Sequence, residues 1–126
     1  NHIRVAGSLT EAVARARNAE SGLPIVVEAR SEEEAEEAAA LEVDRILLDN
    51  FNPPALARVL KRLVVARRGK KPPVIEVSGG LKLSNIREYA LPGVSFLSVG
   101  ALTHSAPAID LSLMVDAVGA EVAKGD

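Results

Sequence analysis

Short apolar runs alternate with amphipathic stretches along the chain, and this alternation predicts its elements. Runs of aliphatic and β-branched residues predict strands at 25–28, 45–48, 74–77 and 94–99. Apolar residues at helical spacing predict helices over 8–22, from 31, after 52 and over 85–90. Residues 1–4 are expected to be the tail of a strand or the loop after it. The alternating apolar residues of 109–115 favour a last strand over a short helix.

Polar residues before the helical stretches give the expected helix starts. Ser8 with Glu11, and Ser31 with Glu34, have the spacing of capping boxes, in which each side chain satisfies a free backbone donor. Asn52 is expected to cap the third helix, with Pro53 in its first turn. Ser84 is expected to cap the short fourth helix. The third helix has the following apolar positions, expected to be buried: Ala55, Leu56, Val59, Leu60, Leu63 and Val64.

Two charged runs have ordinary interpretations. The acidic run 32–37 is expected to form a solvated helix face, with its first acids beside the positive end of the helix dipole. The basic run 67–71 is expected to close the third helix, where cations suit the negative end of the dipole. A nucleic-acid site is the weaker interpretation of the basic run, because no aromatic residue lies near it for stacking.

The alternation of strands and helices predicts an α/β fold with parallel βα repeats and right-handed crossovers. Four or five strands do not close a barrel of eight. The chain is therefore expected to be an incomplete, TIM-like α/β barrel or, alternatively, an open doubly wound sheet. Its 126 residues suit one domain. Because it begins at Asn1 without a methionine or a leading strand, residues 1–126 are expected to be the C-terminal part of a longer protein.

Composition narrows the classes of partner. Apolar residues make up 48% of the chain and aromatic residues only 2%, as expected for a core of aliphatic strands buried on both faces. A net charge of −2 gives no field that would attract nucleic acid. No apolar run approaches the roughly 20 residues of a membrane span, and cysteine is absent. We therefore expect a cytoplasmic protein that binds neither nucleic acid nor membrane.

Chemistry is expected where the strands end. Two strands end in carboxylates, Glu28 and Asp49, and two run into glycine, at Ser78-Gly79-Gly80 and Gly100-Ala101. Parallel strands bring these groups to one edge of the sheet, where α/β proteins carry their sites. The carboxylates could share one Mg²⁺, which binds one or two carboxylates and completes its shell with waters and substrate phosphates. Backbone N–H groups at the glycines favour an anion such as phosphate.

Each of these residues also has a simpler interpretation. Either carboxylate could cap a helix or pair with a nearby arginine, and a glycine pair is often only a turn. His104 lies four residues past Gly100 and could either donate to a phosphate or have no role in binding. Glu76 lies within an apolar strand, so it would need a Lys or Arg partner if it faced a barrel interior.

The motifs taken together resemble the quinolinate phosphoribosyltransferase family. They run in order over nearly the whole chain: Asn1-His2-Ile3, Val27-Glu28, Leu48-Asp49-Asn50, Glu76-Val77-Ser78-Gly79-Gly80, Asn85–Ala90 and Ser98–Ser105. The resemblance implies formation of nicotinate mononucleotide, pyrophosphate and CO₂ from quinolinate and phosphoribosyl pyrophosphate in NAD biosynthesis, by a Mg²⁺-dependent homo-oligomer. It implies that Glu28 and Asp49 hold metal and ribose hydroxyls. It also implies that Ser78, Gly79, Gly80, Gly100, Ala101 and His104 bind phosphate, with Asn1, His2 and Asn50 as possible contributors.

The resemblance also implies that parts of the family's fold are absent here. The family has an N-terminal α/β sandwich and further barrel strands, with arginines and lysines that clamp quinolinate, whereas Arg4, Arg45 and Lys82 do not match those positions. The chain alone is therefore expected to bind phosphate or a phosphosugar without turnover. Two alternatives remain open: a phosphate-binding α/β module of another barrel family, and a non-catalytic half-barrel that self-associates through its sheet edges.

Overall fold

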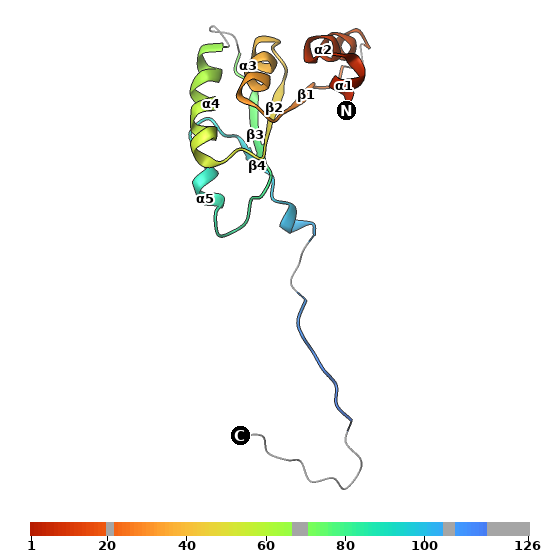
Figure 1. Ribbon diagram of the computed structural model, residues 1–126, viewed down its shortest axis with the longest axis vertical. Coiled ribbons are helices and arrows are strands. Elements are labelled where there is room, and N and C mark those ends of the chain that lie inside the picture. The colour runs from red at the N-terminus through yellow and green to blue at the C-terminus, as the bar shows by residue number, and fades with distance from the viewer. Residues whose placement is uncertain (20–21, 67–70, 105–107, 116–126) are drawn as a thin grey trace.

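The structure is a computed structural model that describes residues 1–19, 22–66, 71–104 and 108–115. One parallel sheet contains β1 (Val26–Ala29), β2 (Arg45–Asp49), β3 (Val74–Ser78) and β4 (Phe96–Leu97), in that spatial order (Figure 1). The helices are α1 (His2–Ala6), α2 (Leu9–Asn18), α3 (Glu32–Ala40), α4 (Pro53–Ala66) and α5 (Ile86–Tyr89), and a 3₁₀ turn follows at Gly100–Leu102. The α/β class with parallel βα repeats is confirmed.

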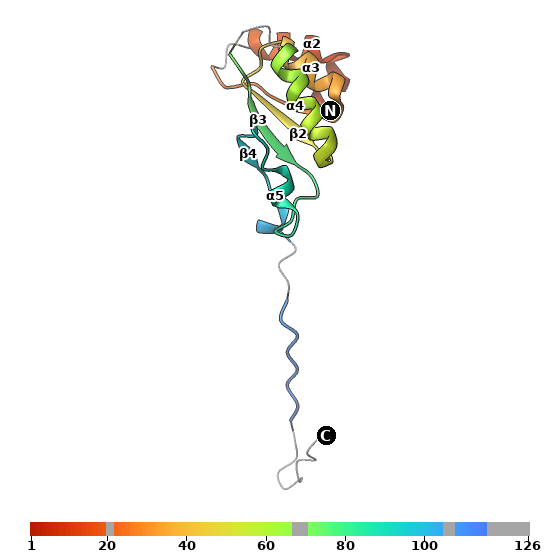
Figure 2. The same cartoon turned by 90° about the vertical axis from the view of Figure 1, so that its left-hand side faces the viewer.

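The strand order distinguishes the two architectures that the sequence left open. A doubly wound sheet reverses its strand order partway, whereas each strand here lies beside the one before it. With right-handed crossovers, a sequential order places successive helices on the same face, as in an α/β barrel. Figure 2 shows α3 and α4 together over one face. The described strands therefore form an open, barrel-like sheet with β1 and β4 at its edges.

Alternate residues of each strand divide the sheet into two unlike faces. The covered face lies beneath α3 and α4, and its residues in β1, β2 and β3 are all buried: Val27, Ala29, Ile46, Leu48, Ile75 and Val77. Leu56 and Val59 of α4 and three alanines of α3 complete this core. The small alanines let α3 approach the sheet closely. The core is mainly aliphatic, as the composition predicts, and also contains the rings of Phe51 and Tyr89.

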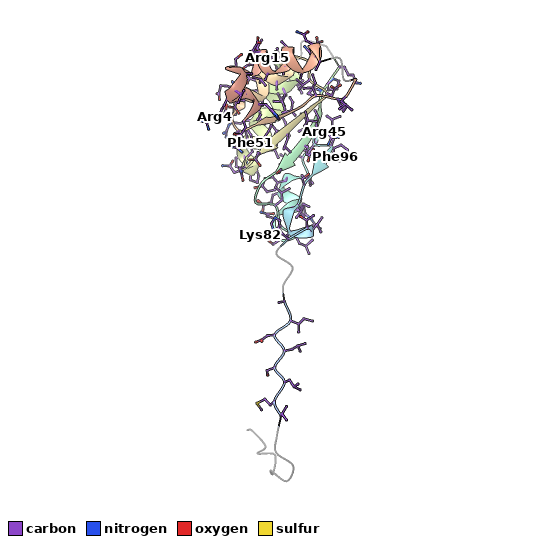
Figure 3. All side chains as sticks on the ribbon, turned by 90° about the vertical axis from the view of Figure 1, so that its right-hand side faces the viewer. Arg4, Arg15, Arg45, Phe51, Lys82 and Phe96 are labelled. Carbon is purple, nitrogen blue, oxygen red and sulfur yellow. The ribbon has the colours of Figure 1, made fainter. Side chains whose placement is uncertain are left out.

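The opposite face, here called the open face, has partly exposed and charged residues. They are Val26, Glu28, Arg45, Leu47, Asp49, Val74, Glu76, Ser78 and Phe96. Val26 and Phe96 are both 51% exposed. Figure 3 shows Arg45 and Phe96 on this side of the strands. Strands buried on both faces were predicted, and that prediction is wrong for the part of the chain that the structure describes.

The expected helix starts are largely confirmed. The hydroxyls of Ser8 and Ser31 accept hydrogen bonds from the backbone N–H groups of Glu11 and Glu34. Asn52 Oδ1 accepts from the backbone N–H of Ala55 at 2.9 Å, so Asn52 caps α4. Ser84 does not cap α5, because the residue before the helix is Asn85, whose side chain binds the preceding loop instead.

Residues 1–4 were predicted to be the tail of a strand or the loop after it, and that prediction is wrong. His2, Ile3 and Arg4 belong to α1, which is capped at its C-terminal end by Gly7 in the left-handed conformation with φ 95°. The Gly7 N–H donates to the carbonyl of Ile3, so glycine closes this single turn. The helix then packs against α2.

The last predicted strands differ from the structure. The strand expected at 94–99 is reduced to Phe96–Leu97, paired with Glu76 and Val77. It is the edge of the described sheet, so hydrogen bonds to one neighbour alone hold it. Residues 108–115 form no strand, because alternation produces a strand only where a neighbour accepts the backbone hydrogen bonds.

Two predictions for the helix surfaces also need correction. Val64 is 60% exposed, so the buried stripe of α4 ends at Leu63. The acidic run of α3 is only partly solvated, because Glu32 and Glu36 pair with Arg58 and Arg62 of α4. The basic run at 67–71 lies almost entirely outside the described residues. Within the described ranges, no helix combines the length and apolar character that crossing a membrane requires.

Candidate functional site at the carboxyl edge of the sheet

The strand register brings the predicted site residues to one edge of the sheet. Asp49 lies directly opposite Ser78 across the β2–β3 pair, and both are the last residues of their strands. Glu28 lies opposite Leu47, two residues before Asp49, on the same open face. The expectation that these groups meet at one edge agrees with this geometry.

Arg30 lies between the two carboxylates. Its guanidinium nitrogens lie 2.6 and 2.8 Å from Glu28 Oε1, and its Nε lies 3.6 Å from Asp49 Oδ2. The two acids are thus close enough to share one cation, and the cation present is an arginine. This matches the simpler alternative that each acid pairs with a nearby arginine. Sequence reasoning missed Arg30, although its position two residues after Glu28 predicts the same face.

Asp49 is held by its neighbours on both sides. The Asn50 side-chain amide donates to Asp49 Oδ2 at 2.7 Å, and the Ser78 hydroxyl donates to Asp49 Oδ1 at 3.3 Å. The Asp49 side chain is only 15% exposed, compared with 46% for Glu28. Asp49 is therefore the better fixed of the two acids.

The turn at Gly79-Gly80 requires glycine at its first position. Gly79 has φ 91°, and a Cβ there would lie 2.3 Å from Asn50 Oδ1 and 2.7 Å from the Asn50 backbone nitrogen. Asn50 itself is left-handed, with φ 60°, and its N–H donates to the Ser78 carbonyl at 2.9 Å. The turns after β2 and β3 therefore interlock, and no side chain fits between them.

The glycine pair does not lie at the start of a helix, which corrects the prediction. The next helix, α5, begins only at Ile86 and has four residues. Asn85 connects it to the turn, because its side chain donates to the Gly80 carbonyl and accepts from the Lys82 N–H. A phosphate at this turn would meet loop backbone rather than a helix dipole.

The second glycine turn follows β4, the neighbour of β3. Gly100 and Ala101 begin the 3₁₀ turn, and the Gly100 carbonyl accepts from the backbone N–H groups of Thr103 and His104. A Cβ on Gly100 would lie 2.6 Å from His104 Nε2, so the imidazole lies close to the glycine. The structure thus brings Gly100, Ala101 and His104 together, beyond the strand next to that of Ser78.

Glu76 pairs with an arginine, as the sequence analysis predicted for a carboxylate within an apolar strand. Arg45 Nη1 lies 2.9 Å from Glu76 Oε2, and the Ser98 hydroxyl donates to Glu76 Oε1 at 2.5 Å. These bonds, first that from Ser98 and then those from Arg45, lower the pKa of the Glu76 carboxyl. Arg45 also stacks on the Phe96 ring, 4.9 Å from its centroid. Sequence reasoning placed Phe96 and Ser98 in the strand predicted at 94–99 but did not identify them as partners of Arg45 and Glu76, because such contacts depend on how the strands pair.

Asn1 and His2 lie apart from this arrangement. They are exposed at the start of α1, which packs on α2, and no described hydrogen bond or ion pair joins them to Glu28 or Asp49.

A hollow of about 520 Å³ lies away from the carboxyl edge of the sheet. Its lining includes Ile25 and Asp44, which precede β1 and β2, so it opens at the amino ends of the strands.

The side chains at the carboxyl edge that could coordinate a metal are the carboxylates of Glu28 and Asp49, and they determine which metal the edge suits. No cluster of three or more His, Cys, Asp or Glu side chains that could hold a metal occurs among residues 1–19, 22–66, 71–104 and 108–115. Two carboxylates fit a Mg²⁺ ion whose remaining ligands are waters and the phosphates of a substrate. The edge therefore suits a metal that arrives with a phosphorylated ligand.

Comparison with known proteins identifies, over most of the chain, the same family that the sequence motifs resemble. Residues 1–114 match the family model described as the C-terminal domain of quinolinate phosphoribosyl transferase. A probable nicotinate-nucleotide pyrophosphorylase [carboxylating] of Methanocaldococcus jannaschii is 43% identical over 115 residues, covering 90% of this chain and 40% of that protein. The rat nicotinate-nucleotide pyrophosphorylase [carboxylating] is 39% identical over 122 residues, covering 94% of this chain and 39% of the relative.

Solved structures of two related proteins have the same arrangement of elements. NadC from Streptococcus pyogenes superposes with a TM-score of 0.73 at 33% identity, covering 87% of this chain and 37% of that one. The nicotinate-nucleotide pyrophosphorylase from Ehrlichia chaffeensis gives a TM-score of 0.71 at 33% identity, covering 82% and 35%. The chain thus spans about two fifths of the length of its relatives. It belongs to the quinolinate phosphoribosyl transferase family and corresponds to that family's C-terminal domain.

Proposed function

We propose that this chain supplies the phosphoribosyl pyrophosphate-binding part of a carboxylating nicotinate-nucleotide pyrophosphorylase. The whole enzyme would convert quinolinate and phosphoribosyl pyrophosphate into nicotinate mononucleotide, pyrophosphate and CO₂ in NAD biosynthesis. Residues 1–126 would form one α/β domain in the C-terminal part of that enzyme. The observation that carries the proposal is the meeting of Asp49, Glu28 and the Ser78–Gly80 turn at one edge of the sheet.

The proposed roles follow from the chemistry of each group. Glu28 and Asp49 would accept hydrogen bonds from the ribose hydroxyls and would bind Mg²⁺, since carboxylates are suited to both tasks. The backbone at Ser78, Gly79 and Gly80 would bind phosphate after β3, and that at Gly100 and Ala101 after β4, with His104 as a donor. Support comes from the adjacency of β3 and β4 and from the absence of side chains at three of these five positions.

The anionic edge also suits the transition state of phosphoribosyl transfer. As the bond to pyrophosphate breaks, positive charge develops at the ribose C1 atom. Fixed carboxylates near the ribose stabilise that charge without having to reorganise. Bound Mg²⁺ would neutralise charge on the pyrophosphate. Asp49, which is held by Asn50 and Ser78, is the better preorganised of the two acids.

The chain alone is proposed to bind the phosphosugar without turnover. Isothermal titration with phosphoribosyl pyrophosphate and Mg²⁺ tests the first part. Asp49→Asn should weaken binding about ten-fold or more, because a charge-assisted contact is lost. The control is Glu11→Gln, because Glu11 is an exposed acid on α2 that pairs with Arg15. This variant should bind phosphoribosyl pyrophosphate as the unaltered chain does. Equal binding by Asp49→Asn would contradict the proposed site.

The second part is tested by assaying release of nicotinate mononucleotide. The 126-residue chain should give none, because the family's quinolinate-clamping residues have no counterpart at Arg4, Arg45 or Lys82. Adding the remaining part of a relative's chain should restore turnover if the proposal holds. Robust turnover by the 126 residues alone would show that quinolinate is bound by residues other than those proposed.

We further propose a cytoplasmic homo-oligomer. Phosphoribosyl pyrophosphate is highly charged and stays in the compartment where it is made, which supports the location. The open face and the two sheet edges support self-association, because Val26 and Phe96 are 51% exposed there. The same observation favours the alternative of a non-catalytic half-barrel. Concentration-dependent sedimentation without any affinity for phosphoribosyl pyrophosphate would favour that alternative.

A further inference from the structure

A single guanidinium occupies the position where the proposed function places a metal ion. Arg30 contacts Glu28 Oε1 through two nitrogens, at 2.6 and 2.8 Å, and its Nε lies 3.6 Å from Asp49 Oδ2. Asp49 Oδ2 also accepts from the Asn50 amide at 2.7 Å. One positive charge therefore already offsets half of the negative charge of the two carboxylates.

A metal ion and this guanidinium compete for the same side chains. Mg²⁺ binds carboxylate oxygens at about 2.0–2.1 Å and demands near-octahedral geometry. A divalent ion on Glu28 and Asp49 would lie within a few ångströms of the Arg30 guanidinium, and the two cations would repel each other. Either the arginine moves or the ion does not bind both acids.

Arg30 is placed so that its side chain moves without the backbone. The side chain is 72% exposed and lies just past the end of β1. Its backbone N–H donates to Glu34 Oε2 at 2.8 Å, which holds the main chain to the first turn of α3. Exposed ion pairs of this kind contribute little to stability, so releasing the guanidinium costs little.

We infer that Arg30 is a resident cation that a divalent metal must displace from Glu28 and Asp49, and that it thereby weakens metal binding by the chain. The inference rests on the proposed function, which places Mg²⁺ at these two carboxylates. In the absence of metal, Arg30 keeps the two acids from repelling each other. When metal binds, the guanidinium swings into solvent or toward the phosphates of the ligand.

The first test is a calorimetric Mn²⁺ titration of the 126-residue chain and of Arg30→Gln. The variant should bind Mn²⁺ about five-fold more tightly, which corresponds to loss of one exposed competing ion pair. Arg15→Gln is the matched control, because Arg15 forms an exposed ion pair with Glu11 on α2 and its loss changes the net charge equally. The control should bind as the unaltered chain does.

The second test separates displacement from the general effect of removing a positive charge. The Arg30 Nε–H resonance is followed by NMR while Mg²⁺ is added. It should move to the position of a solvated guanidinium, while the Arg15 resonance stays in place. An Arg30 resonance that keeps its ion-paired position at saturating metal would overturn the inference.

A third variant distinguishes failure of this inference from failure of the proposed site. Asp49→Asn is combined with Arg30→Gln, and tight Mn²⁺ binding should be lost. If Asp49→Asn abolishes binding but Arg30→Gln does not strengthen it, the Arg30 inference fails and the metal site stands. If Asp49→Asn has no effect, or if no variant binds Mn²⁺ even with phosphoribosyl pyrophosphate present, the metal is not held by these acids and both fail.

Discussion

The two faces of the sheet are made from the same strands, yet they differ in almost every physical respect. Residues 46, 48, 75 and 77 on the covered face are aliphatic, at most 5% exposed and packed by α3 and α4. One position away in each case, the open face has Arg45, Asp49, Glu76 and Ser78, which bind one another through ion pairs and hydrogen bonds. The period of two in a strand thus separates a face that stabilises the fold from a face available for chemistry.

The two faces also differ in how completely the described chain buries their apolar residues. The covered face buries its apolar residues within the described chain. The open face still exposes Val26, Val74 and Phe96 beside its charges. The ion pair of Arg45 and Glu76 lies beside the Phe96 ring, half of which is exposed. Substitutions on the two faces should therefore have effects of different size and kind.

The largest effect is expected on the covered face. Leu48→Ala should lower the free energy of unfolding by about 2–5 kcal/mol, because Leu48 is fully buried and leaves a cavity. Val26→Ala, on the open face, should cost less than about 1 kcal/mol, because half of that side chain is already in water. Urea unfolding followed by circular dichroism measures both. Equal losses would show that the open face is buried too, for example in an oligomer.

A smaller effect is expected from the charged network of the open face. Glu76→Gln should cost about 1 kcal/mol, the value for hydrogen bonds to a charged group discounted for partial exposure. The Glu76 side chain is 17% exposed and Arg45 is 39% exposed. Arg45→Met and the double variant complete a cycle that isolates the pair, and urea unfolding measures each. A coupling energy near zero would show that the ion pair does not contribute to the free energy of unfolding.

The same variant makes a prediction for pH. The pKa of Glu76 is lowered in the folded chain, chiefly by the Ser98 hydroxyl and then by Arg45. Its contribution to stability is therefore fully present above the ordinary glutamate pKa of about 4.3, and is lost as the pH falls through the lowered folded value. Glu76→Gln should flatten the fall in stability below about pH 4.3. Part of the slope should remain, because Arg62 and other groups also lower the pKa of Glu32.

The smallest effect on the free energy of unfolding should come from the Phe96 ring, on which Arg45 stacks. Phe96→Leu keeps an apolar side chain but removes the aromatic face, so it should cost about 0.5–1 kcal/mol through the lost cation–π contact. In Arg45→Met the same substitution should cost less, because there is no cation to lose. A cost that is unchanged in the Arg45→Met background would assign the effect to packing instead.

Much of the fold follows from local signals in the sequence. Ser8, Ser31 and Asn52 cap the helices they were expected to cap, because a cap depends on residues only three positions apart. The strands at 26–29, 45–49 and 74–78 follow from short aliphatic runs. The end of the chain was harder to predict. Residues 109–115 have the alternation of a strand, but a strand also needs a neighbour, which a pattern cannot supply.

The site was predicted as a set of positions rather than as a set of contacts. Glu28, Asp49 and the glycine turns meet at one edge because parallel strands align their ends. The Glu76 partner was expected to be a Lys or Arg, and Arg45 fills that role through contact across two strands. Arg30 was missed because sequence reasoning treated the acids as ligands for an absent ion. Pairing of either acid with a nearby arginine was weighed as an alternative, but Arg30, two residues after Glu28, was not named.

The close contact at Gly79 limits how this edge can be redesigned. A methyl group there would collide with both the side chain and the main chain of Asn50, so the loops that follow the second and third strands cannot be altered one at a time. An engineer who wished to make room at this edge for a bulkier sugar would have to exchange both loops as a matched pair. A library that randomises either loop alone should return glycine at position 79 in nearly every folded clone.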